Sequence, residues 1–317
     1  MMQNNIKVSI IAPIYGVEKY IKRFTKSVLS LDYDNIEFIF VNDCTKDNSI
    51  QVLSDVVKSN PNKADRVRII NHEVNKGLAG ARLTGINNAT GDYVWLVDSD
   101  DYINEKAIEE ALPYMYNGDD LICSNFYRVT SDGIKEVYIE RPTVKSIITS
   151  FSSPSVWKYF IKRSLITMNN IYPIQGINFS EDHLLMARLA LKANRISYLN
   201  NSFFYYYDCT NMESYMRNIN DKSLINYAQD GVIVFDFYSA QVSVKDYKEA
   251  LVFMLLSRIW NLLSVKSQKD LVIQLLKRLK SVEKFYSTFV CTFIWSPRIV
   301  KALSSFYFKL FSKKILS

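Results

Sequence analysis

The sequence predicts an α/β fold in which a mostly parallel sheet is flanked by helices and followed by a C-terminal helical region. Short apolar runs alternate with helical patterns over the first hundred residues, which is typical of βαβ units. From about residue 220 onward, helical patterns follow one another with no strand pattern between them. We therefore expect an α/β domain over residues 1–217 and a helical region over residues 218–317.

Four apolar runs predict the strands of the parallel sheet. Such strands are buried on both faces, so they read as nearly continuous apolar sequence. The expected strands span residues 8–13, 36–41, 66–70 and 93–97. The expected helices between them span residues 17–31, 46–59 and 78–89.

The middle of the chain predicts a less regular order of elements. We expect helices over residues 104–115, 155–167 and 180–193. We expect a strand over residues 121–124, a hairpin over residues 126–140, and short strands over residues 195–199 and 203–207.

The amino-acid composition indicates a globular protein with an anionic binding partner. Hydrophobic residues make up 48% of the 317 residues, enough for a large core. The net charge of +7 favours an anionic partner such as a nucleotide, a nucleic acid or an anionic membrane surface. No recognition motif supports nucleic-acid binding, so we do not expect it. Cysteines 44, 123, 209 and 291 have no metal-type spacing, and we expect reduced thiols.

The sequence also predicts where the protein resides. Residues 1–7 lack the basic and apolar segments of a signal peptide. The longest uncharged apolar stretch, residues 285–297, is shorter than the roughly 20 residues that a spanning helix needs. We therefore expect a cytoplasmic protein, with peripheral attachment to the inner face of the cell membrane as a candidate role of its C-terminal region.

An apolar run that ends in three carboxylates is the most informative feature of the chain. The predicted strand at residues 93–97 is followed directly by Asp98, Asp100 and Asp101. Carboxylates this close repel one another, and burying them without compensation is costly. Mg²⁺ or Mn²⁺ would compensate the charge at the edge where such sheets bind ligands. The alternative is a solvated loop that caps the next helix.

Several further motifs accompany this acidic segment in a fixed order. They are Ile11-Ala-Pro-Ile-Tyr15 with Glu18 and Tyr20, Val41-Asn-Asp43 with Asp47 and Ser49, Asn75-Lys-Gly77 with Ala81-Arg82 and Gly85, Gly91-Asp-Tyr93, Trp157-Lys158 and Glu181-Asp182. Over roughly residues 6–215 this order resembles the family 2 glycosyltransferases, which are inverting enzymes of the GT-A fold. The resemblance implies a Rossmann-like, mostly parallel sheet flanked by helices.

The resemblance also implies roles for individual residues. The implied donor-binding residues are Pro13, Tyr15, Glu18, Asp43, Lys76, Arg82, Asp98 and Ser99. The implied ligands of Mg²⁺ or Mn²⁺ are Asp100 and Asp98, the latter also near the ribose. Asp101 is then a helix cap or a group behind the metal ligands. Asp182 matches the catalytic base, and Glu181 supports it or orients the acceptor.

The residues at the predicted strand ends have their own physical logic. Tyr15 can stack on a flat base, or it can be a packed tyrosine in a turn. Asp43 can accept the N3–H of a uracil, as the resemblance implies, or cap the following helix. Arg82 and the helix start after Lys76 favour phosphate, although Arg82 alone also fits a surface salt bridge.

The pair Glu181-Asp182 opens a predicted helix late in the α/β part. An inverting transfer needs a base that takes the proton of the acceptor hydroxyl. The alternative is that acids in a first helical turn are favoured by the helix dipole. His72 and His183 belong to no ligand-like cluster, and we expect both to be structural or exposed.

Three positions depart from the commonest family pattern. Asn42 stands where aspartate is frequent, Cys44 where glycine is frequent, and Leu83 where asparagine is frequent. None removes a predicted catalytic group, but Cys44 lies beside the base pocket and leaves the donor preference open. Asp208 lies where some relatives supply a further metal ligand, and we do not assign it that role.

The end of the chain has a basic and aromatic character. Residues 284–317 contain six basic residues and no acidic one. Projected on a helix, residues 299–313 place Ile299, Leu303, Phe306 and Leu310 on one face and Lys301, Lys309 and Lys313 on the other. This pattern is typical of a helix that lies on an anionic membrane surface. The alternative is a helix packed on the α/β domain.

The sequence therefore predicts an inverting glycosyltransferase. It moves a sugar from a nucleotide-diphosphate donor, taken to be a UDP-sugar, to a hydroxyl of a glycan or lipid-linked acceptor in surface polysaccharide biosynthesis. One alternative is a sugar-phosphate nucleotidyltransferase, but Ala12-Pro-Ile-Tyr-Gly16 is not the glycine-rich phosphate loop of that class. Another is an inactive membrane-surface scaffold, against which the presence of Asp98, Asp100 and Asp182 argues.

Overall fold

The computed structural model describes residues 6–150, 154–211, 219–262, 265 and 268–282. The chain forms two compact units. The first unit comprises residues 1–142, 155–176 and 192–214, and the second comprises residues 143–154, 177–191 and 215–317. A domain boundary at residue 217 stays a prediction.

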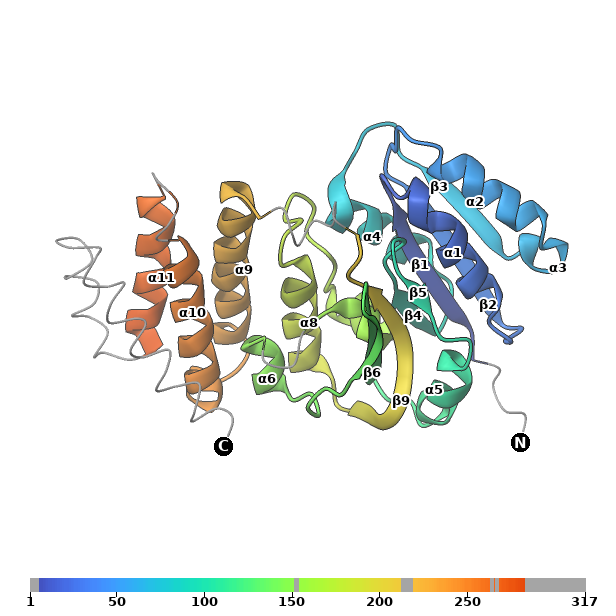
Figure 1. The fold of residues 1–317 in the computed structure, drawn as a ribbon. Helices are drawn as coiled ribbons and strands as arrows, with labels where there is room; N and C mark the ends of the chain where they lie inside the picture. Colours follow the sequence, from blue (N-terminus) through green and yellow to red (C-terminus); the bar gives the residue numbers. More distant parts are fainter. Residues whose placement is uncertain (1–5, 151–153, 212–218, 263–264, 266–267, 283–317) are drawn as a thin grey trace. The chain divides into compact units, whose positions relative to one another are not determined.

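A mixed sheet of nine strands organises the described part of the first unit (Figure 1). Its order is β3 (Val67–Asn71), β2 (Ile36–Asn42), β1 (Val8–Ile14), β4 (Tyr93–Leu96), β8 (Tyr159–Lys162), β6 (Leu121–Thr130), β9 (Ile196–Asp208) and β5 (Tyr102–Ile103), with β7 (Gly133–Val137) paired to β6. The pairs β1–β2, β1–β4 and β2–β3 are all parallel. The expected α/β fold with flanking helices is confirmed, and the described sheet is mixed, because β5, β7 and β8 pair antiparallel with their neighbours.

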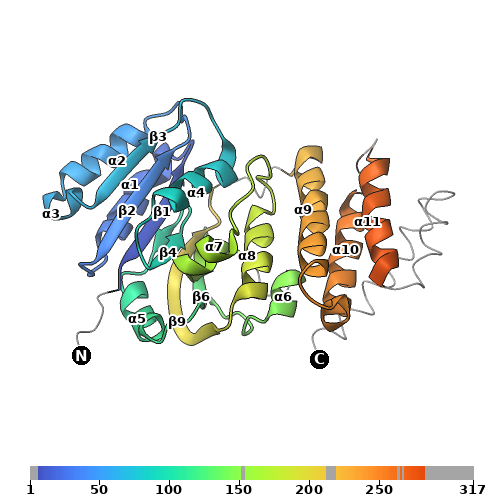
Figure 2. The same cartoon turned by 180° about the vertical axis from the view of Figure 1, so that it is seen from behind.

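The helices of the first unit cover both faces of this sheet. They are α1 (Glu18–Leu29), α2 (Ser49–Lys58), α3 (Pro61–Ala64), α4 (Gly77–Asn88), α5 (Ala107–Tyr116), the 3₁₀ turn η1 (Val156–Lys158) and α7 (Arg163–Asn169). Figure 1 shows α1 and α2 in front of the strands, and Figure 2 shows α4 in front of them from the opposite side.

Alternation along β1 explains why both faces are covered. Successive side chains of a strand point to opposite faces. Ile10 and Ile14 belong to the core that includes Phe24 of α1, while Ile11 meets α4. The approach of α4 is so close that a Cβ on Gly85 would lie 2.2 Å from Cγ2 of Ile11. A glycine is therefore required at this position.

The expected helix over residues 155–167 is wrong. The structure has η1, then strand β8, then α7 over this segment. β8 pairs antiparallel with both β4 and β6, so it lies inside the sheet. A short apolar run such as Tyr159-Phe-Ile does not distinguish a buried strand from a helical turn, because both bury it completely.

A second difference concerns the two short strands expected at residues 195–199 and 203–207. They form one strand, β9, which pairs in parallel with β6 through a register shift near Asn125. β9 extends to Asp208 and also pairs with β5. The end of β9 thereby lies beside the segment that follows β4, and it contributes to the site described below.

The second unit is helical. Its elements are α6 (Val144–Ile148), α8 (Glu181–Lys192), α9 (Asp221–Ser239), the 3₁₀ turn η3 (Val244–Tyr247), α10 (Lys248–Leu262) and α11 (Lys269–Val282). Helices α9, α10 and α11 pack together (Figure 1). Most leucines on α10 and α11, such as Leu255 and Leu275, are buried. The expected helical region after the sheet is confirmed.

The predicted amphipathic helix over residues 299–313 lies outside the described residues, as does the whole basic segment 284–317. Among the helices that the structure describes, none combines the length and the apolar character needed to cross a membrane.

Candidate functional site

The carboxyl ends of β1, β2 and β4 meet at one edge of the sheet. Ile14 at the end of β1 is level with Asn42 at the end of β2, and β4 lies on the other side of β1. Ser99, which follows β4, donates a hydrogen bond from its Oγ to the carbonyl oxygen of Pro13 over 2.6 Å. Two predicted donor-binding residues are thereby joined at the edge where parallel sheets bind ligands.

Asp43 holds the loop that leads into α4. Its side chain is almost fully buried. Oδ1 accepts from the backbone N–H of Lys76 at 2.8 Å and lies 2.7 Å from Nδ1 of His72, while Oδ2 accepts from the N–H of Gly77 at 2.8 Å. Asp43 thus accepts from the N–H groups at the start of α4, and not from those of α2, the helix that directly follows it. The reason is that β3 is adjacent to β2, which brings the start of α4 to the end of β2.

The loop after β1 is tied to the start of α2. Glu18 accepts from the backbone N–H and the side-chain amide of Asn48 at 3.0 and 3.1 Å. In the opposite direction, Asp47 accepts from the backbone N–H of Glu18 at 3.0 Å. Tyr15 precedes these anchored residues, and its side chain is 55% exposed. The predicted base-stacking residue is therefore accessible on a fixed loop.

Arg82 and Asp98 form an ion pair at the same edge. Nη2 of Arg82 lies 2.7 Å from Oδ1 of Asp98. The arginine is 2% exposed and comes from α4, while the aspartate follows β4. The expectation that Arg82 forms a surface salt bridge is half right, because the pair exists but its cation is buried.

The segment Asp98–Asp101, which we call the acidic turn, is held by the end of β9. The backbone N–H of Asp98 donates to the hydroxyl of Tyr205 at 3.0 Å. Oδ1 of Asp101 accepts from the N–H of Asp208 at 2.6 Å. The side-chain amide of Asn211 donates to Oδ2 of Asp100 at 2.8 Å. The expectation of a solvated loop is not met, because Asp101 is 1% exposed.

Arg23 of α1 contacts the acidic turn from another side. Its Nη2 donates to the carbonyl oxygen of Asp100 at 3.1 Å and lies 2.5 Å from Oδ2 of Asp208. Thr210 donates to the other oxygen of Asp208, from its backbone and its hydroxyl. Both carboxylate oxygens of Asp208 are therefore engaged within the protein.

Burial and the neighbouring carboxylates raise the pKa values of two carboxyl groups in the acidic turn. Burial raises the pKa of the Asp100 carboxyl, and the nearby Asp208 raises it further, although the Asn211 hydrogen bond opposes the change. Burial also raises the pKa of Asp101 well above its usual range, with Asp100 and Asp98 adding to the rise. A cation beside these groups would restore their ordinary ionisation.

The donor set of the acidic turn fits Mg²⁺ or Mn²⁺. Both ions prefer oxygen ligands, and Mg²⁺ is commonly held by one or two carboxylates together with substrate phosphates. Among the described residues, no group of three or more histidine, cysteine, aspartate or glutamate side chains is arranged to hold a metal ion. The oxygen ligands of the acidic turn fit such an ion chemically, but the described residues form no complete metal site by themselves.

Glu181 and Asp182 belong to the second unit, where they form the first turn of α8. Glu181 is buried and Asp182 is partly buried. The carbonyl oxygen of Ser180 accepts the first helical hydrogen bond, from the N–H of Leu184. The other predicted site residues lie in the first unit.

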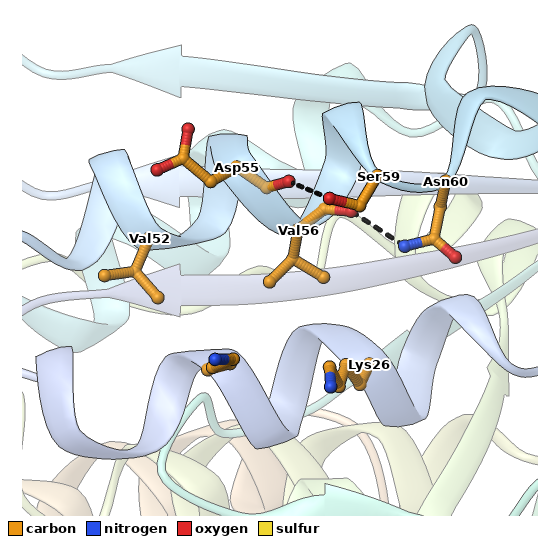
Figure 3. A pocket seen from close by; sticks show the side chains of 7 residues that line it. Lys26, Val52, Asp55, Val56, Ser59 and Asn60 are labelled. Atoms are coloured by element: carbon orange, nitrogen blue, oxygen red, sulfur yellow. Dashed lines mark hydrogen bonds between the residues drawn. The ribbon is translucent and has the colours of Figure 1, made fainter.

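A groove between α1 and α2 contains none of the predicted site residues. It has a volume of about 480 Å³ and is lined by Lys22, Lys26, Val52, Asp55, Val56, Ser59 and Asn60. Figure 3 shows that its drawn hydrogen bonds run from Ser59 and Asn60 to backbone oxygens of α2. Its polar groups serve the local helix end and do not converge on a common point.

Sequence reasoning missed three residues that shape the site: Arg23, Tyr205 and Asn211. Tyr205 and Asn211 lie more than 100 positions beyond the acidic turn that they contact. The run Tyr205-Tyr-Tyr207-Asp208 was the available signal, since a strand rich in tyrosine that ends in an acid points to a polar edge.

The chain is similar in sequence to known glycosyltransferases. The family model described as Glycosyl transferase family 2 matches residues 9–179. The uncharacterized glycosyltransferase EpsJ of Bacillus subtilis is 32% identical over 63% of this chain and 60% of its own length. The poly(ribitol-phosphate) beta-N-acetylglucosaminyltransferase TarS of Staphylococcus aureus is 30% identical over 63% of this chain and 35% of its own length. The chain thus spans less than two thirds of each of these relatives.

Solved structures give the same result for the fold. A crystal structure of residues 1–349 of S. aureus TarS in complex with UDP-GlcNAc superposes with a TM-score of 0.67 at 23% identity, covering 87% of this chain and 80% of that one. The mannosyltransferase PcManGT of Pyrobaculum calidifontis, in complex with GDP-Man and Mn²⁺, superposes with a TM-score of 0.58 at 15% identity, covering 98% of this chain and 87% of that one. These likenesses confirm the expected GT-A fold.

The family match covers more than half of the chain, and it includes the ends of β1, β2 and β4 and the acidic turn. The chain therefore belongs to glycosyl transferase family 2.

Proposed function

We propose that the protein is an inverting glycosyltransferase that moves a sugar from a UDP-sugar to a hydroxyl of a glycan or lipid-linked acceptor. The observation that carries this proposal is the acidic turn at the carboxyl edge of the sheet, where burial raises the pKa of Asp100 and Asp101. Carboxylates gathered at the ligand-binding edge are suited to a diphosphate bound with a divalent cation.

The donor lies on the loops that follow β1, β2 and β4. The exposed ring of Tyr15 stacks on the base. Asp43 already accepts from two backbone N–H groups and contacts His72, and a carboxylate has about four acceptor positions. One position thus remains for the N3–H of a uracil. Pro13 and Ser99, joined by their hydrogen bond, form the wall between base and diphosphate.

Both acidic and basic groups face the diphosphate of the donor. Asp98 and Asp100 hold Mg²⁺ or Mn²⁺, which stabilises negative charge on the departing nucleotide when it is bound. Arg82, which is already paired with Asp98, fixes the direction of that carboxylate. Lys76 and the N-terminus of α4 add favourable potential for a phosphate group. Glu18 contributes by fixing the loop that carries Tyr15.

Asp182 is the proposed base, and Glu181 supports it or orients the acceptor. The base removes the proton of the acceptor hydroxyl while the hydroxyl oxygen attacks the anomeric carbon, so that the bond to the nucleotide diphosphate breaks with inversion. Asp182 lies in the first turn of α8, where the partial positive charge of the helix N-terminus attracts negative groups.

The relatives support the choice of donor. The TarS fragment was crystallised with UDP-GlcNAc and with UDP, and the full TarS protein bears the name of a beta-N-acetylglucosaminyltransferase. We therefore take UDP-GlcNAc as the first donor to test and surface polysaccharide synthesis as the proposed setting. Attachment of the basic segment 284–317 to the cytoplasmic face of an anionic membrane is part of the same proposal.

The test begins with UDP-GlcNAc and other UDP-sugars in a thermal-shift screen with Mn²⁺, since a ligand that binds the folded state raises its stability. UDP release from the best donor, with water as acceptor, then gives the turnover. Asp182→Asn should lower it by about 10²-fold or more with little change in donor affinity. The matched control is Asp221→Asn, another acid in a first helical turn of the second unit. Near-normal turnover in Asp182→Asn would overturn the assignment of the base.

A further inference from the structure

A buried ionic cluster lies inside the second unit, and we call it the Asp230 cluster. It consists of Asp230 on α9, Arg258 on α10 and His183 on α8, whose side chains are 0%, 1% and 2% exposed. Nη2 of Arg258 lies 2.7 Å from Oδ2 of Asp230. Nδ1 of His183 lies 2.8 Å from Oδ1 of the same carboxylate. Three helices thus meet at one carboxylate.

The carboxylate of Asp230 contacts two residues close to Asp182 at the start of α8. The hydroxyl of Ser180, two residues before Asp182, donates to Oδ2 of Asp230 at 3.1 Å. His183, the residue directly after Asp182, contacts both oxygens of Asp230. The other ring nitrogen of His183 lies 2.8 Å from the carbonyl oxygen of Ile148 on α6. The first turn of α8 is therefore clamped from α9 and from α6.

The clamp extends one turn along α9. Asn226, which precedes Asp230 by four residues and so lies on the same helix face, accepts from the backbone N–H of Asn178 at 3.2 Å. Ser180 itself has a φ of +67°, a left-handed conformation that costs a non-glycine residue about 1 kcal/mol or more. Its hydrogen bond to Asp230 holds the backbone in this conformation. Residues 178–183 are thus set by two side chains of α9.

Arg258 is fixed as firmly as the carboxylate that it contacts. Its guanidinium lies 3.9 Å from the ring centre of Tyr227, whose hydroxyl accepts from Nη1 at 2.7 Å. A Cβ on Gly231 would lie 2.8 Å from Cγ of Arg258, so a glycine is needed for α9 and α10 to approach this closely. Burial alone would raise the pKa of the Asp230 carboxyl, but His183 and Arg258 hold it below its usual range.

Stability alone is a weak explanation for this cluster. A buried ion pair costs nearly as much desolvation as it gains in attraction, and apolar residues of similar volume often replace one without loss of stability. What such a pair does supply is one defined geometry. Here that geometry is imposed on Ser180, two residues before Asp182, and on His183, directly after it.

We propose that Asp230, His183 and Arg258 act as positioning residues that fix the first turn of α8 and thereby the carboxylate of Asp182. This inference rests on the proposed function of Asp182 as base. A misplacement of about 1 Å in such a group can cost as much as 10²-fold in rate, so the cluster acts on turnover without touching the donor or the acceptor.

The test compares three variants of the full chain. His183→Leu removes both contacts of the ring. His183→Asn retains a donor where Nδ1 of the histidine lies and serves as the conservative replacement. Tyr238→Phe is the control, because the buried hydroxyl of Tyr238 on α9 donates to the carbonyl oxygen of Ala187, in the middle of α8, at 2.7 Å. Ser180→Ala is the milder substitute if His183→Leu does not fold.

Turnover is measured as UDP release from UDP-GlcNAc in Mn²⁺. His183→Leu should lower kcat by about tenfold or more, with KM for UDP-GlcNAc unchanged, and His183→Asn should recover most of the loss. In the Asp182→Asn background, His183→Leu should cost less than about twofold, because the group that it positions is already gone. Tyr238→Phe should change kcat by less than about twofold in either background.

Hydrogen exchange of the peptide spanning residues 178–186 needs no donor and tests the clamp directly. It should be faster in His183→Leu and in Ser180→Ala than in Tyr238→Phe. Unchanged exchange in the two cluster variants would overturn the proposal whatever the donor is. An equal loss of kcat in the wild-type and Asp182→Asn backgrounds would also overturn it while leaving the proposed function intact. Normal turnover in Asp182→Asn would instead remove the base, and with it the role of the cluster.

Discussion

The two units each contain a buried carboxylate centre, and the two centres differ in how their charge is balanced. In the acidic turn, Asp98, Asp100 and Asp101 lie within four residues, and the pKa values of Asp100 and Asp101 are raised. In the Asp230 cluster, one carboxylate faces a guanidinium and an imidazole, and its pKa is lowered. We propose a divalent cation for the acidic turn, whereas the Asp230 cluster joins three helices of the protein through its own ion pairs.

The largest effect is expected when the Asp230 cluster loses its arginine. Arg258→Met leaves Asp230 buried without its cation, which should reduce the free energy of unfolding by about 3–5 kcal/mol. The control is Arg278→Met, which removes the partner of Asp236 on the same helix α9. That pair is partly exposed, so its loss should cost no more than about 1 kcal/mol. Urea unfolding of both variants measures the difference, and equal losses would show that the Asp230 cluster is an ordinary surface-like pair.

The second prediction removes a negative charge from the acidic turn. The folded pKa of Asp101 lies above its unfolded value, so the folded state binds the proton more tightly, and stability falls as the pH rises through this interval. Asp101→Asn removes that penalty while its Oδ1 can still accept from the N–H of Asp208. In a metal chelator at neutral pH, Asp101→Asn should therefore be more stable than the wild type.

Asp230→Asn should show the opposite sign in the same measurement. The folded pKa of Asp230 is lowered, so its contribution to stability is present above the unfolded value of about 4 and is lost as the pH falls through the lowered folded value. Urea unfolding at several pH values from neutral downward compares the two variants. The contrast between the centres fails if both substitutions destabilise the protein at neutral pH.

A smaller effect is expected from Asn211. Its amide donates to Oδ2 of Asp100 at 2.8 Å, and a single hydrogen bond of this kind contributes about 1 kcal/mol. Asn211→Ala should weaken UDP binding in Mn²⁺ by about fivefold, because Asp100 loses part of its orientation. Asn169→Ala, which removes an amide hydrogen bond within α7, is the control and should leave UDP affinity unchanged. Calorimetric titration with UDP distinguishes these outcomes.

Local sequence patterns were sufficient for the first half of the sheet. β1, β2 and β4 are nearly continuous apolar runs that end in polar residues, so their extent and the edge at which their carboxyl ends meet followed from the sequence. β8 was missed because its four residues carry too little periodicity to separate a strand from a helix. Its place between β4 and β6 depends on pairing with distant strands, which local pattern does not encode.

The same limit applies to the two carboxylate centres. The acidic turn was visible because its carboxylates are neighbours in the sequence. The Asp230 cluster was not, since its members are separated by 28 to 75 positions. His183 was expected to be structural or exposed, and it is buried, but its acidic partner Asp230 lies on a different helix. Periodicity predicts that a helix is buried, not which polar groups meet when it packs.

The most direct test of this account is the dependence of UDP binding on a divalent cation. UDP is titrated into the wild type and into Asp100→Asn by calorimetry, once in Mn²⁺ and once in chelator. If the acidic turn binds a divalent cation together with UDP, Mn²⁺ should tighten UDP binding to the wild type by at least about tenfold. Asp100→Asn should lose most of this increase in affinity, while its free energy of unfolding in chelator stays that of the wild type. Equal UDP affinity in Mn²⁺ and in chelator for the wild type would contradict the account.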